Sequence, residues 1–171
     1  MKKPELLAPA GSFEKANVAF MYGADAVYCG TASLSLRSRA EVDDNDLEKT
    51  IKYAHSIGKK VYAALNIYAW DTNYEEIEKQ VKMLDEVHVD AIIASDGGVI
   101  QKIREIAPNI EIHVSTQANV VSYHAAKFWY DNGAKRVILG RETSKDQIQE
   151  IMKNKPEDLE VEMFIHGALC W

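Results

Sequence analysis

Short β-prone runs alternate with amphipathic helical segments along the whole chain, and this alternation limits the possible folds more than any other feature. Seven runs are expected to be strands, at residues 5–9, 25–29, 60–67, 91–94, 110–116, 136–139 and 159–166. Between them, apolar side chains recur with the 3.6-residue period of a helix, as Leu47, Ile51 and Ala54 do. Repeated strand–helix units favour parallel strands joined by right-handed crossovers. The sequence therefore predicts an α/β fold.

A weak internal repeat supports this layout and helps to choose the architecture. Residues 23–30 and 133–140 share the frame Gly-Ala-x-x-Val-x-x-Gly, which is typical of a helix that ends at a glycine and leads into a strand. A doubly wound sheet and a (β/α)8 barrel both fit repeated units of this kind. Residues 8–12 read Ala-Pro-Ala-Gly-Ser, so no Gly-x-Gly-x-x-Gly follows the first expected strand, and the barrel is favoured.

The barrel is expected to be incomplete. A TIM-type (β/α)8 barrel has eight strands and typically about 250 residues, whereas this sequence offers about seven βα units in 171 residues. We therefore predict a single barrel domain over residues 1–171 that stops before the eighth strand.

Composition excludes several classes of protein. The net charge of −6 argues against a broad basic surface for nucleic acid, although a local basic loop stays compatible with it. No run of about 18 apolar residues is present, so no membrane span is expected. The two cysteines have no framework spacing and fit a reducing compartment, so the expected location is the cytoplasm.

Polar residues near the ends of two expected strands are the candidates for chemistry, because barrel enzymes gather catalytic groups at the carboxyl ends of their strands. His113, Ser115 and Gln117 alternate along one strand and share a face, as do Glu162 and His166 on the last strand. A polar strand face covered by helices must point into the barrel, where each group needs a partner or a substrate. These five residues are the candidate catalytic residues, although the two histidines also fit satisfied core positions.

Six further polar residues lie at the end of an expected strand or after one and are candidate substrate-binding residues: Arg37, Arg39, Asn66, Asp96, Arg141 and Glu142. Two arginines in one loop, at 37 and 39, are suited to clamp a carboxylate or a phosphate, although a solvated loop fits them equally. Asp96 precedes Gly97-Gly98 and fits a helix N-cap as well as a site role. Arg141 and Glu142 also fit a simple surface ion pair.

The order of short motifs along the chain resembles peptidase family U32, the collagenase-like peptidases. The early motifs are Pro4-Glu5-Leu6-Leu7-Ala8-Pro9-Ala10-Gly11, Gly23-Ala24-Asp25-Ala26-Val27-Tyr28 and Leu36-Arg37-Ser38-Arg39-Ala40. The later ones are Leu65-Asn66, Ser95-Asp96-Gly97-Gly98, His113-Val114-Ser115-Thr116-Gln117 and Leu139-Gly140-Arg141-Glu142. Residues 162–170, Glu-Met-Phe-Ile-His-Gly-Ala-Leu-Cys, resemble the start of the family signature. The resemblance therefore spans the whole chain.

The resemblance implies a function and a cofactor. The family was named for proteolysis, but several members are similar to tRNA or rRNA hydroxylation proteins or to hydroxylases of ubiquinone biosynthesis. Those members bind a four-iron four-sulfur cluster through four cysteines, the first of which aligns with Cys170. A cluster is ordinarily held by four thiolates, and Cys29 does not match a ligand position of the motif. We expect full-length relatives to hold the cluster and this chain alone to hold none stably.

Hydroxylation of RNA or of a quinone precursor is the favoured activity. In that reaction Arg37, Arg39 and Arg141 would hold an anionic substrate or hydroxyl donor through charge-assisted hydrogen bonds. Proton transfer near the reacting atom would fall to His113, His166 and Glu162.

Two other readings stay open. A peptidase would use Ser115 with His113 or His166, but i, i+2 neighbours on one strand lie side by side, which is poor geometry for activating a nucleophile. A non-enzymatic reading starts from the unclosed barrel, whose edge strands are free to pair with another chain. In that case a second copy or a completing partner chain would cover the open edges.

Overall fold

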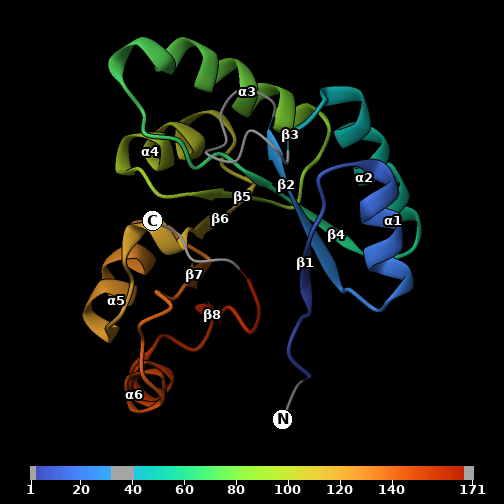
Figure 1. The fold of residues 1–171 in the computed structure, drawn as a ribbon. Coiled ribbons are helices and arrows are strands. Elements are labelled where there is room, and N and C mark those ends of the chain that lie inside the picture. The colour runs from blue at the N-terminus through green and yellow to red at the C-terminus, as the bar shows by residue number, and fades with distance from the viewer. Residues whose placement is uncertain (1–2, 32–40, 168–171) are drawn as a thin grey trace. The chain divides into compact units, whose positions relative to one another are not determined.

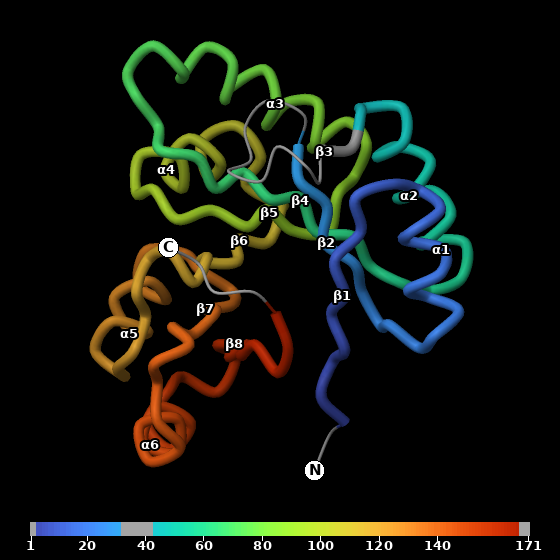
Figure 2. Tube along the Cα trace, in the orientation of Figure 1, coloured from blue at the N-terminus to red at the C-terminus, as the bar shows by residue number. Residues whose placement is uncertain are grey.

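The computed structural model describes residues 3–31 and 41–167, apart from the side chains of residues 41 and 42. The candidate residues Arg37, Arg39 and Cys170 lie outside this part of the chain. The chain forms two compact units, Met1–Ile110 and Glu111–Trp171. Figures 1 and 2 show that both units alternate strands with helices. The single barrel domain over residues 1–171 stays a prediction.

The first unit contains a parallel sheet in the order β1-β2-β4-β5, and β3 pairs with β2, also in parallel. Its strands are β1 (Leu7–Pro9), β2 (Ala26–Thr31), β3 (Glu41–Val42), β4 (Lys60–Ala64) and β5 (Ala91–Ala94). Its helices are α1 (Phe13–Met21), α2 (Asp44–Ser56), the short 3-10 turn η1 (Asp71–Asn73), α3 (Tyr74–Glu86) and α4 (Gly97–Ile106).

The second unit contains three parallel strands in the order β6-β7-β8. These strands are β6 (Glu111–Val114), β7 (Arg136–Ile138) and β8 (Glu160–Glu162). Its helical elements are the 3-10 turn η2 (Thr116–Ala118), α5 (Tyr123–Asp131) and α6 (Lys145–Asn154).

Local sequence signals explain where the helices begin and end. Ser12 and Ser144 accept backbone hydrogen bonds as helix N-caps, and Ser144 with Gln147 completes the capping box that its spacing predicts. Gly23 and Gly133 have φ values of +98° and +94°, so both helices of the repeat end in the left-handed conformation that glycine adopts at low steric cost. The repeat therefore marks two equivalent helix-to-strand junctions.

The core of the first unit follows the predicted periodicities. All four residues of β5 are buried, as a strand covered on both faces requires. The apolar faces of α3 and α4 are buried as well, through Ile77, Val81 and Leu84 in one helix and Val99, Ile100 and Ile103 in the other. None of the helices in the described ranges is long and apolar enough to cross a bilayer.

Every predicted strand run overlaps an observed strand, but four of them end earlier than expected. The runs 60–67, 110–116 and 159–166 end as strands at Ala64, Val114 and Glu162, and the run 136–139 ends one residue early, at Ile138. After β6, Ser115 caps η2 instead of continuing the ladder, so Gln117 does not belong to the strand. The short strand β3 has no counterpart in the sequence prediction. Polar–apolar alternation thus extends beyond the hydrogen-bonded part of the sheet.

Candidate functional site

The turn after β7 is held by hydrogen bonds to both backbone groups of Gly140. The Gly140 N–H donates to the Val120 carbonyl at 3.0 Å, and the Thr143 hydroxyl donates to the Gly140 carbonyl at 2.6 Å. A Cβ at position 140 would lie 2.8 Å from Glu142 Oε1 and 2.9 Å from Val121 Cγ1, so a larger residue there would force these two side chains to shift. This turn fixes the backbone from which Arg141 projects.

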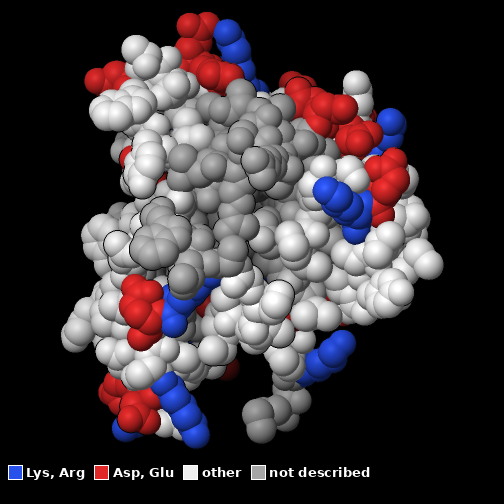
Figure 3. Space-filling model, in the orientation of Figure 1, with Lys and Arg blue, Asp and Glu red and all other residues white. Residues whose placement is uncertain are grey.

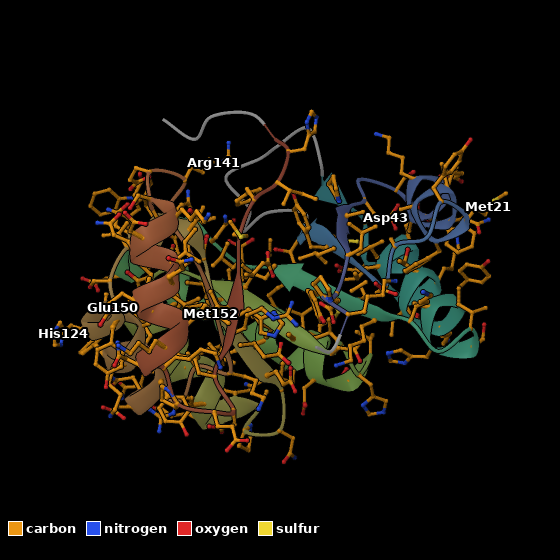
Figure 4. The ribbon with its side chains drawn as sticks, turned by 90° about the horizontal axis from the view of Figure 1, so that it is seen from below. Met21, Asp43, His124, Arg141, Glu150 and Met152 are labelled. Atoms are coloured by element: carbon orange, nitrogen blue, oxygen red, sulfur yellow. The ribbon has the colours of Figure 1, made fainter. Side chains whose placement is uncertain are left out.

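Arg141 is the residue of this turn with unused hydrogen-bonding capacity. Its Nε and Nη2 atoms are buried and have no hydrogen-bond partner within residues 3–31 and 41–167. Its guanidinium carbon lies 4.2 Å from the centroid of the Phe164 ring, in cation–π contact. Figure 4 shows Arg141 beside the N-terminal end of α6. Nε and Nη2 form one side of the guanidinium fork, the edge that binds a carboxylate or a phosphate through two parallel hydrogen bonds.

The segment after β8 completes the surroundings of Arg141. Gly167 has φ +155°, and a Cβ there would lie 3.4 Å from Arg141 Nη2 and 3.5 Å from Phe164 Cδ1. Gly167 therefore lies in van der Waals contact range of both the guanidinium and the Phe164 ring. His166, next to Gly167, is exposed. The arrangement brings a cationic group, an aromatic ring and an exposed imidazole into one stretch of the second unit.

Hydrogen bonds join the loops after β6 and β7. The Thr116 hydroxyl donates to the Leu139 carbonyl at 3.2 Å, beside the bond between Gly140 and Val120. Gln117, in the first of these loops, has a buried Oε1 that no donor among the described residues reaches. Adjacent loops thus offer one amide acceptor and two guanidinium donors that have no hydrogen-bond partner among the described residues, which is typical of a binding site for a polar ligand.

Two predicted catalytic residues, His113 and Glu162, belong to a charged cluster around the buried side chain of Arg136. Arg136, only 6% exposed, donates from Nε at 2.8 Å to Glu160 Oε2 and from Nη1 at 3.1 Å to Glu162 Oε2. His113 lies inside β6, in register with Arg136, and its Nε2 is 3.4 Å from Glu111 Oε2. Glu162 therefore holds an ion pair. Arg136 was not among the predicted site residues, although an arginine inside a β-prone run was a usable signal.

Burial sets the protonation of His113. The imidazole is fully buried, and this desolvation lowers its pKa despite the opposing hydrogen bond to Glu111. In the unfolded chain the histidine has a pKa of about 6.5, so acidification below that value favours the unfolded state until the lower pKa of the folded state is reached. We expect the urea-measured unfolding free energy to fall from about pH 7 to about pH 5 more steeply in the wild type than in His113→Gln. Parallel pH profiles would contradict this.

In the first unit, Asp96 acts as a helix cap. Its Oδ1 accepts from Gly98 N at 2.9 Å and Val99 N at 3.0 Å, and also from the Tyr74 hydroxyl at 3.4 Å. Of the two roles considered for Asp96, the structure therefore shows the helix N-cap. Asn66 follows β4, and its buried Oδ1 has no partner in the described parts of the chain. Glu142 is exposed and borders the Gly140 turn.

The described residues do not fit an iron–sulfur cluster. Within residues 3–31 and 41–167, no group of three or more His, Cys, Asp or Glu is placed to hold a metal ion. Cys29 is a free, buried thiol, and burial raises its pKa to about 12, which disfavours the thiolate that binds iron. The ligand role expected for Cys170 stays a prediction.

Comparisons with known proteins cover nearly the whole chain. The model of peptidase family U32 matches residues 11–171. The tRNA hydroxylation protein P of Haemophilus influenzae is 47% identical over 98% of this chain and 36% of its own length. An uncharacterized protease of Methanocaldococcus jannaschii is 42% identical over 97% of this chain and 41% of its own. The 23S rRNA 5-hydroxycytidine C2501 synthase of Escherichia coli is 37% identical over 97% and 25%.

Solved structures support the predicted architecture. A U32 peptidase superposes with a TM-score of 0.73 at 14% identity, covering 93% of this chain and 68% of its own. Phosphonopyruvate hydrolase, solved with oxalate and Mg²⁺, superposes with a TM-score of 0.61, also at 14% identity, over 94% and 67%. These identities establish the fold alone. The prediction of a TIM-type α/β fold with parallel strands is confirmed.

Proposed function

The chain belongs to peptidase family U32, and from that premise we propose that its protein takes part in the hydroxylation of RNA, with transfer RNA as the substrate class. The observation that carries the proposal is the 47% identity to a tRNA hydroxylation protein over 98% of this chain. A second relative is named for making hydroxycytidine in ribosomal RNA, so both names share hydroxylation of RNA. These names favour RNA over a quinone precursor. Because the chain spans 36% and 25% of these two relatives, the proposal concerns the activity of the whole protein.

The second unit supplies the binding group for this reaction. The Nε and Nη2 edge of Arg141 fits an anionic group, either a phosphate of the RNA or a carboxylate of a hydroxyl donor. His166 is exposed and is the proposed proton-transfer group. His113, Ser115, Gln117 and Glu162 are proposed to support this region from β6, its following loop and β8. Arg37 and Arg39 stay proposed as a second clamp, and Cys170 as a cluster ligand in the longer relatives.

The test is the oxygen content of tRNA nucleosides. The coding gene is deleted in its source organism and restored on a plasmid. Purified tRNA from each strain is digested to nucleosides, whose masses are measured by mass spectrometry. We expect a nucleoside carrying one added oxygen atom to disappear on deletion and to return on complementation. Identical nucleoside profiles in all three strains would refute the proposal.

Proteolysis is the alternative, favoured by the 42% identity to a relative named as a protease. In the structure, Ser115 Oγ accepts the Gln117 N–H at 3.4 Å, so the hydroxyl caps η2. We therefore expect Ser115→Ala to leave RNA hydroxylation within about threefold of the wild type. The substitution removes a helix cap, which costs about 1 kcal/mol of stability, but removes no group that takes part in the hydroxylation. Cleavage of gelatin by the purified protein, abolished by Ser115→Ala, would favour the peptidase instead.

Open sheet edges support a proposed partner. In the described part of the chain, β1 pairs only with β2, and β8 pairs only with β7. Unpaired strand edges favour association, so we propose a second copy or a completing chain at these edges. Light scattering of the purified protein tests this, and a stable monomer at micromolar concentration would contradict it.

A further inference from the structure

The loop after β4 presents two aromatic side chains to solvent. Residues 65–73 connect β4 with α3, and within them Tyr68 is 74% exposed and Trp70 is 73% exposed. The loop leaves the carboxyl end of β4, the end at which TIM-type folds bind their ligands. The two exposed rings therefore lie on the loop that leaves the ligand-binding end of this strand.

The backbone that carries the rings is anchored at both ends. At the start, Leu65 N donates to the Ile93 carbonyl at 2.8 Å. At the end, Trp70 N donates to Asn73 Oδ1 at 3.0 Å, and Asn73 N donates back to the Trp70 carbonyl at 2.8 Å. The ring of Trp70 therefore projects from a fixed backbone, which lowers the entropy lost when a partner binds.

A third feature of the same loop concerns hydrogen bonding. Asn66 lies two residues before Tyr68, and its buried Oδ1 has no partner among residues 3–31 and 41–167. A buried amide oxygen without a donor is costly, so this position is suited to a ligand that brings an N–H group. Nucleobases carry such donors on their edges and a π face for stacking.

The charges around the loop select the part of an RNA that fits. Asp71, Glu75 and Glu76 follow the rings directly and are all exposed. Glu75 is paired with Lys79 at 2.7 Å, and the net acidic charge that is left disfavours phosphate groups. Figure 3 shows Lys and Arg interspersed with Asp and Glu on the face drawn. The loop is therefore suited to an uncharged base, while the phosphates are held elsewhere.

We propose that Tyr68 and Trp70 form a stacking platform for an unpaired nucleobase of the RNA substrate, with the Asn66 amide accepting a hydrogen bond from the edge of that base. This inference rests on the proposed RNA function and adds the element that recognises the base. Aromatic stacking tolerates different bases, because each has a π face. Single-stranded loops expose the bases that such platforms bind.

The first experiment measures equilibrium binding of an unmodified tRNA transcript by fluorescence anisotropy. Trp70→Ala and Tyr68→Ala should each raise the dissociation constant about 5- to 150-fold, the range for loss of one stacked base. Trp70→Phe and Tyr68→Phe keep a ring and should stay close to the wild type. The matched control is Tyr22→Ala, which removes a ring that is 87% exposed at the C-cap of α1, on the side of the amino end of β2. This control should bind like the wild type.

The second experiment separates stacking from charge. Phosphate contacts weaken steeply with salt, whereas the ratio between Trp70→Ala and wild-type affinities should stay constant as salt is raised. An abasic ribose-phosphate oligomer should bind both proteins equally. Equal tRNA affinities of wild type and Trp70→Ala would overturn the platform.

The nucleoside assay keeps this inference separate from the proposed function. If tRNA hydroxylation depends on the gene but both alanine variants bind and hydroxylate normally, only the platform is wrong. If the wild type does not bind tRNA, the platform falls, and the nucleoside assay alone then decides the proposed function.

Discussion

Arg141→Met is expected to remove nearly all of the proposed tRNA hydroxylation while leaving the protein folded. The substitution removes the Nε and Nη2 donors that lack partners in the described structure and keeps an apolar chain against Phe164. Each hydrogen bond to a charged group is worth about 1.5–3 kcal/mol. Loss of two such bonds predicts a decrease of at least about 100-fold in kcat/KM, measured by nucleoside mass spectrometry with the purified protein.

The stability of this variant distinguishes a binding role from a structural one. Buried polar atoms without partners destabilise a fold, so Arg141→Met should unfold at the same or a higher urea concentration than the wild type. Arg141→Lys keeps a positive charge but loses the planar fork, and should recover only part of the activity. Lys145→Met, at an exposed position at the start of α6, is the matched control and should be fully active. Full activity of Arg141→Met would remove Arg141 from the site.

Sequence patterns predicted the features of this fold that depend on near neighbours. The run 91–94 is an observed strand because four consecutive apolar residues bounded by polar ones fit a strand buried on both faces. Ser144 and Gln147 form their capping box because both partners lie within one helical turn. The N-cap role of Asp96 could be considered from the sequence because its partners, Gly98 and Val99, are also near neighbours.

The site could be predicted only in part, because its contacts join residues that are far apart in the sequence. Arg141 was a candidate from its place after a strand, but its two unused donors depend on burial beside Phe164 and Gly167. His113 was expected near a strand end and lies fully buried inside β6. The role of Glu162 depends on Arg136, 26 residues earlier in the chain.

Arg136→Met should be the most destabilising of the single substitutions considered for this chain. Removal of one partner from a buried ion pair leaves its carboxylates without compensation, at a cost of about 3–5 kcal/mol. We expect a loss at the lower end of this range. The Glu160 side chain is 47% exposed and stays solvated, so the uncompensated charge is mainly that of Glu162, which is only 20% exposed. Urea unfolding should therefore show a loss of about 3 kcal/mol.

Two comparison variants test whether charge is the cause of this loss. Adding Glu160→Gln and Glu162→Gln to Arg136→Met removes the uncompensated charges and should restore part of the lost free energy. Lys127→Met breaks an exposed pair with Asp131, whose side chains are 41% and 54% exposed, and should cost less than about 1 kcal/mol. If Arg136→Met unfolds at the same urea concentration as Lys127→Met, the cluster does not stabilise the second unit. If the triple variant is no more stable than Arg136→Met, lost packing of the arginine side chain explains the effect better than charge.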